Sequence, residues 1–242
     1  FNHKEAARSF REAQALDPTC AMCFWGEALV LGPNINAGMD VADNPRAFEA
    51  VQQAMDLRSN ATEPERAYIE ALATRYAKVA PDDRRHLDLA YAEAMGEVAR
   101  RFPQDPDAAS LYAEALMDTT PWDYWEKDGS PKPVTGKILA TLEAVLGEHP
   151  IHPLANHLYI HAVEKVHPQR AVAAADRLRD LVPGAGHLVH MPGHIYIRVG
   201  RYKEAVLANE KAIAADDAYI AQCHAQGLYP VAYVPHNHHF LA

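Results

Sequence analysis

Histidine is the residue type whose spacing most clearly predicts chemistry in this chain. The sequence holds 14 histidines among 242 residues, and all but two of them lie in its second half. His157 and His161 are four residues apart, so on a helix both imidazoles can reach one metal ion, as in the helices of zinc proteases. Glu164 lies within about the same 60° sector of that helix. It is a candidate third ligand, orienting residue or general base.

A second cluster has the same character. On one helix, His187, His190 and His194 would occupy a sector of about 60°. Pro192 lacks a backbone N–H, so together with Gly193 it should kink this helix or mark its true start. In the second case, the first two histidines of the cluster lie in the preceding turn.

These histidines must be positioned by helices that recur along the chain. The segment 200–205 (GRYKEA) resembles part of a tetratricopeptide repeat (TPR), a family with a period of about 34 residues. Residues 4–10 (KEAARSF) show the same pattern, and Ala171 precedes Ala205 by 34 residues. The resemblance implies an all-α fold, a TPR-like α-solenoid of antiparallel helix pairs, with residues 1–242 as a single domain.

The resemblance also implies where the histidines meet. His157 and His190 are 33 residues apart, as are His161 and His194. In the TPR family the first helix of each pair lines a concave groove, so both clusters should be neighbours there. The stretch 187–202 (HLVHMPGHIYIRVGRY) further resembles His-rich TPR proteins of bacteria, a resemblance that implies no particular activity.

Proline-containing turns separate the predicted helices. We predict helices over residues 4–16, 20–31, 45–57, 63–79, 84–101, 106–117, 135–147, 153–165, 168–181, 187–199 and 202–215, with further helices starting at 217 and 234. The last of these would carry two more candidate ligands, His236 and His238. Because the array begins on a second helix and stops inside a first one, we expect further repeats beyond both ends.

Two segments interrupt the repeats. Residues 32–44 are polar and turn-forming, and residues 118–136 form a long insertion that contains Trp122 and Trp125. A loop of this length is usually functional or disordered, and its aromatic residues argue against disorder. Its tryptophans therefore either pack against the core or wall a binding pocket.

Composition excludes some classes of function. The net charge is -9 and no Lys/Arg run is present, which argues against nucleic acid and anionic membranes. No apolar run approaches the roughly 20 residues that span a bilayer. The compartment is left open, with a soluble protein of the cytoplasm favoured over the periplasm or secretion. We interpret Cys20 and Cys23, a lone CxxC, as two small residues packed in a helix.

These features leave two hypotheses of function. In the first, the histidines bind a transition metal (zinc, copper or iron) in the groove of a TPR scaffold, either as a carrier or as a metal-dependent hydrolase or oxidase. Its small-molecule or peptide ligand would meet residues flanking the site, namely Tyr159, Tyr196, Arg198, Trp122 and Trp125. In the alternative, the chain is a metal-free adaptor whose groove binds a peptide or protein. Without a metal, the histidines would form a polar groove for an anionic ligand or structural hydrogen bonds between stacked helices.

Overall fold

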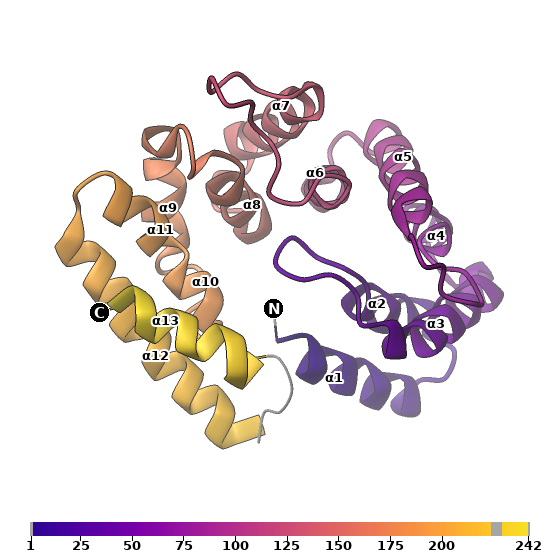
Figure 1. Cartoon of the computed structure of the whole chain (residues 1–242). Coiled ribbons are helices and arrows are strands. Elements are labelled where there is room, and N and C mark those ends of the chain that lie inside the picture. The colour runs from indigo at the N-terminus through magenta and orange to yellow at the C-terminus, as the bar shows by residue number, and fades with distance from the viewer. Residues whose placement is uncertain (1, 224–228, 242) are drawn as a thin grey trace. The chain divides into compact units, whose positions relative to one another are not determined.

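The computed structural model describes residues 2–223 and 229–241, and helices dominate that part of the chain (Figure 1). The described residues contain no β-strand, only two isolated bridges. The chain divides into two compact units, an N-terminal unit of Glu5–Tyr124 and a C-terminal unit of Trp125–Ala242 with Phe1–Lys4. The all-α prediction is confirmed, whereas the solenoid and the single repeat domain stay predictions.

Helices of the N-terminal unit from α2 onward pack against one another in chain order. They are α1 (His3–Leu16), α2 (Ala21–Leu31), α3 (Asn44–Leu57), α4 (Glu63–Ala73), α5 (Arg85–Arg101) and α6 (Pro106–Asp118), with 3-10 turns at Val41–Asp43 and Arg58–Asn60. Side chains cap their starts: Thr62 and Glu65 form a capping box at α4, and Asp105 accepts two backbone N–H groups at α6.

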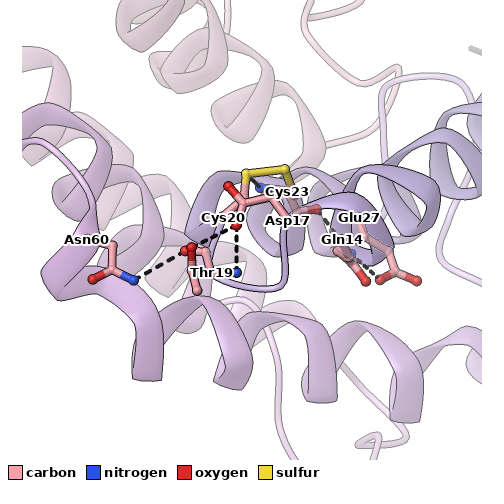
Figure 2. The surroundings of a disulfide bond; sticks show 7 residues. All are labelled: Gln14, Asp17, Thr19, Cys20, Cys23, Glu27 and Asn60. Atoms are coloured by element: carbon pink, nitrogen blue, oxygen red, sulfur yellow. Dashed lines mark hydrogen bonds between the residues drawn. A yellow bond between two sulfur atoms is a disulfide. The ribbon is translucent and has the colours of Figure 1, made fainter.

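A disulfide between Cys20 and Cys23 joins the turn after α1 to the first turn of α2 (Figure 2). Cys20 is also the N-cap of α2, where its sulfur accepts the backbone N–H of Cys23 at 3.2 Å. Gln14 donates to the carbonyl oxygen of Cys23, which ties the bridge to α1. The expectation of two unlinked cysteines is therefore wrong, because the N-cap position brings a CxxC pair within bonding distance.

The C-terminal unit carries the histidines. Its helices are α7 (Pro133–Glu148), α8 (Pro153–Val163), α9 (Val172–Leu178), α10 (Gly186–His190), α11 (Pro192–Arg198), α12 (Tyr202–Cys223) and α13 (Val234–Leu241), with a 3-10 turn at Pro168–Ala171 and a π-helical turn at Tyr229–Tyr233. Both α10 and α11 pack on α12, and α13 lies along α12 (Figure 1). Gly200 makes the tight turn into α12 at a φ of 80°, a conformation that favours glycine.

Most predicted helices are found within two residues of their expected ends, and the exceptions have physical reasons. The helix predicted over 63–79 ends at Ala73, because Arg75 and Tyr76 turn into the core. There the Tyr76 hydroxyl donates to the backbone oxygen of Ala28 at 2.6 Å.

Three other helical predictions need correction. The helix expected over 168–181 begins as a 3-10 turn at Pro168–Ala171, and its α-helical part is only Val172–Leu178. The helices expected at 202–215 and from 217 are one helix, α12, since the interval contains no glycine or proline to stop it. The helix expected over 187–199 is divided at Met191 by Pro192. Among the described residues, no helix is both long and apolar enough to cross a lipid bilayer.

Candidate metal centre

Helix α8 presents its two histidines to the interior. His152 is its N-cap, and the ring Nδ1 accepts the backbone N–H of Ala155 at 3.1 Å, while Pro153 occupies the first turn. Every residue from Ala155 to Val163 is buried, so α8 is surrounded on all sides. Its imidazoles therefore face protein rather than bulk water.

The segment that holds the second cluster is helical on both sides of a break. His187 and His190 lie on α10, and His194 lies on α11. Met191 between them keeps helical dihedral angles, but Pro192 has no N–H to continue the hydrogen-bond ladder. The predicted interruption at Pro192 is confirmed, and all three histidines nevertheless remain on helices.

Six histidines form two groups whose members could each hold one ion. The first triad is His157, His161 and His187; the second triad is His190, His194 and His236. Within each triad, one ligand nitrogen per residue lies within 4.8 Å of the other two. The first triad is buried throughout, and exposure in the second rises towards α13.

The two predicted clusters do meet, but only one of the two pairings that the 33-residue spacing predicts is found. His157 faces His187, with their Nε2 atoms 3.3 Å apart, rather than the repeat-equivalent His190. His161 and His194 do pair as predicted, with ring centroids 5.8 Å apart. Because the segment is broken between α10 and α11, the histidines of these two helices meet those of α8 separately.

Glu164 connects the two triads. Its Oε1 lies 3.0 Å from His161 Nδ1 and its Oε2 lies 2.6 Å from His194 Nδ1. Burial raises the pKa of this carboxyl group, but the two histidine hydrogen bonds outweigh burial, and the pKa falls well below its usual value. A carboxylate only accepts, so both Nδ1 atoms carry protons and Nε2 is the nitrogen that could bind a metal.

Asn209 on α12 fixes the tautomer of His190 in the same way. Its Nδ2 donates to the Ala205 carbonyl oxygen at 2.8 Å, which directs Oδ1 towards His190 Nδ1 at 2.7 Å. His190 therefore donates from Nδ1. Gly193 leaves room for this contact, since a Cβ there would lie 3.0 Å from Asn209 Nδ2.

The assigned tautomers bring the Nε2 atoms of His190 and His194 together at 2.8 Å. At this distance the two nitrogens share either a proton, in an N–H···N hydrogen bond, or another cation that both lone pairs bind. Burial and the neighbouring imidazole lower the pKa of His190 well below the ordinary histidine value, so His190 is the neutral partner.

The third member of the second triad is held by hydrogen bonds behind it. Asp216 on α12 accepts from the Tyr229 hydroxyl at 2.6 Å and from Asn237 Nδ2 at 2.7 Å. These contacts orient α13 so that His236 Nε2 lies 3.5 Å from His194 Nε2. A side chain at Gly186 would collide with the Asp216 carboxylate, so this residue must be glycine.

Aromatic rings pack against members of both triads. Phe240 packs on His190, His194 and His236 at centroid separations of 4.8, 4.5 and 4.7 Å. Tyr233 meets the edge of His187 at 5.0 Å. Such rings limit access of water to the nitrogens and strengthen their electrostatic interactions.

Other candidate residues from the sequence lie outside the triads. His238 is exposed on α13 and belongs to neither. Tyr159 donates to Glu143 and Tyr196 donates to Asp176, both through their hydroxyls, and Arg198 is exposed.

The two tryptophans of the insertion differ from each other. Trp122 is 47% exposed, whereas Trp125 is buried and donates from Nε1 to the Ala162 carbonyl oxygen at the end of α8. Trp125 also meets the ring of His167 edge-on, at 4.8 Å. For Trp125, packing against the core is thus the observed alternative.

Sequence reasoning missed the supporting residues Asn209, Asp216 and Asn237. Asn209 and Asp216 are polar residues inside an alanine-rich helix, and each interrupts an otherwise apolar face. That interruption was a usable signal, because buried polar side chains require partners.

Comparison of the chain with protein-family models and with curated proteins finds no match.

Proposed function

We propose that this chain is a transition-metal-binding protein and that its triads of histidines are the ligands. The observation that carries the proposal is the 2.8 Å separation of the Nε2 atoms of His190 and His194. Glu164 and Asn209 hold the protons of these rings on Nδ1, so their Nε2 atoms face each other. A metal ion in place of a shared proton would be bound by both nitrogens.

The donor set favours zinc or copper, with iron as a third choice. Imidazole nitrogen suits these ions, whereas magnesium and calcium prefer carboxylate and carbonyl oxygen. A tetrahedral zinc ion with Zn–N bonds of 2.0–2.1 Å separates its ligands by about 3.3 Å. The Nε2 separations of 3.3 Å between His157 and His187 and 3.5 Å between His194 and His236 agree with that spacing. The 2.8 Å between His190 and His194 is shorter, so these two rings would move apart on binding an ion.

We further propose that the metal serves a reaction on a TPR-type scaffold, as in a hydrolase or an oxidase. Three histidines leave a fourth coordination position for water or substrate, which is the arrangement of catalytic rather than structural zinc. Glu164 uses both oxygens to orient histidines. It therefore acts as a positioning residue more readily than as a general base.

Metal uptake tests the proposal. Metal-free protein is dialysed against micromolar zinc or, separately, copper, and bound metal is measured by elemental analysis. We expect uptake by the wild type, and a loss of at least one ion per chain in the His190→Ala/His194→Ala variant. The matched control, His86→Ala/His149→Ala, removes two exposed histidines and should bind as the wild type does.

Two outcomes would overturn the proposal. One is a folded wild-type chain that takes up neither zinc nor copper, and the other is equal loss of metal in the two double variants. Metal-free protein that binds a peptide in a manner sensitive to the triad histidines would instead support the adaptor hypothesis.

A further inference from the structure

We propose that the two triads are separate metal sites, so that each chain binds two ions, one on each side of the Glu164 carboxylate. This inference rests on the proposed metal-binding function and specifies the number and linkage of its sites. It goes beyond a single ion because the geometry divides the six histidines into two sets of three.

The division follows from the distances between ligand atoms. Among the described residues, two disjoint groups of three histidines each satisfy a mutual separation of 4.8 Å. One ion has room for about four such ligands in tetrahedral geometry, so six imidazoles exceed its needs. Each triad alone supplies the three protein ligands of an open site.

Glu164 gives each site a share of the same negative charge. One carboxylate oxygen lies on His161 of the first triad and the other on His194 of the second. A bound ion makes the ring N–H of its ligand more acidic and strengthens the hydrogen bond to Glu164. The carboxylate also offsets part of the repulsion between two neighbouring dications. Glu164 thus couples the two sites without ligating either ion.

The triads differ in how readily an ion reaches them. The first triad is almost completely enclosed, with His157, His161 and His187 exposed by 0%, 3% and 4%. His236 at the rim of the second triad is the most exposed of the six histidines. The second triad should therefore load first and quickly, and the first triad should load later and slowly.

Zinc titration against a chromophoric chelator tests both number and order. We expect two zinc ions per chain in the wild type, and one ion in each of two variants, His187→Ala (first triad) and His236→Ala (second triad). Transfer of zinc from the chelator should show two kinetic phases. The fast phase should be lost in His236→Ala and the slow phase in His187→Ala.

The controls separate the possible failures. His149→Ala, an exposed change in the same unit, should keep two ions and both phases. If His187→Ala fails to fold by circular dichroism, His187→Gln replaces it. One ion in the wild type, or loss of both ions in a single-site variant, would overturn the two-site inference and leave the proposed function standing. No ion in the folded wild type would overturn the proposed function itself.

Discussion

The two units bury polar groups in opposite ways. In the N-terminal unit the buried charges are paired: Arg75 and Asp118 meet at 2.6 Å with side chains 3% and 5% exposed. Glu27, fully buried, pairs with Arg46 at 2.6 Å and also contacts Arg11. In the C-terminal unit, six imidazoles form two triads, and a single carboxylate contacts one member of each triad.

This difference separates structural from functional polarity. A buried ion pair with hydrogen bonds is complete, and only the loss of a partner disturbs it. The histidine cluster has ring nitrogens that face one another at distances compatible with a bound cation. We therefore place the function in the C-terminal unit and interpret the buried ion pairs of the other unit as structural.

The largest effect should come from breaking the buried pair of the N-terminal unit. Asp118→Asn leaves the Arg75 charge buried without its partner, and we expect the free energy of unfolding to fall by about 3–5 kcal/mol. Urea unfolding measures the change. As a control, Glu97→Gln breaks an exposed pair with Arg100 and should cause no measurable change. Equal effects of the two variants would contradict the structural interpretation of the Arg75 pair.

Acid should destabilise the metal-free cluster. Burial lowers the pKa of His157, His187 and His190 well below the usual value, so the folded chain keeps them neutral while the unfolded chain takes up protons. Stability is then complete above the unfolded pKa of about 6.5 and falls below it, by about 1.4 kcal/mol per pH unit for each such imidazole.

Urea unfolding of metal-free protein between pH 7.5 and 5 measures this slope. The double variant His157→Ala/His190→Ala should show a shallower dependence, with one imidazole of the three left. A wild-type stability that is flat or rises as the pH falls would contradict the burial of neutral imidazoles.

Loss of the shared carboxylate should weaken metal binding without removing a ligand. Glu164→Gln no longer provides a charged acceptor for His161 and His194, and we expect zinc affinity to fall 10–100-fold, as for other orienting partners of metal ligands. Competition with a chelator measures the affinity. Glu148→Gln, an exposed change in the same unit, should bind as the wild type does. An unchanged affinity in Glu164→Gln would remove Glu164 from the site.

The disulfide should matter least to the histidine cluster. Cys20→Ser/Cys23→Ser opens a very short loop, so the chain-entropy estimate for the loss of stability is only about 2 kcal/mol. Bound zinc, measured by elemental analysis, should not change. A loss of zinc in this variant would show that the bridge serves the metal site.

Disulfides persist in oxidising compartments and are rare in the cytoplasm, so this bond does not agree with the expected cytoplasmic location.

The sequence predicted the helices well because proline, glycine and capping residues mark their ends locally. It could not predict that α4 ends at Ala73, since the cause is long-range: Tyr76 donates to Ala28, 48 residues away. The union of two predicted helices in α12 was missed for a different reason. No glycine or proline near Asp216 separates the two helices, so the break predicted there had no local basis.

The site was predicted in part. Helical spacing predicted that the five histidines of α8, α10 and α11 lie close together, as they do in the structure, and His236, also a predicted ligand, lies beside them. The pairing of His157 with His187 depends on how two helices cross, which a linear period does not contain. Asn209 acts through a hydrogen bond set by tertiary structure, so only the structure reveals its role.

Anomalous diffraction at the zinc edge, from crystals of zinc-loaded protein, tests the central claim most directly. We predict a strong peak within bonding distance of Nε2 of His190, His194 and His236, and a second peak among His157, His161 and His187. Crystals of folded protein that show no anomalous peak at either triad, under conditions where zinc is bound elsewhere or not at all, would contradict it.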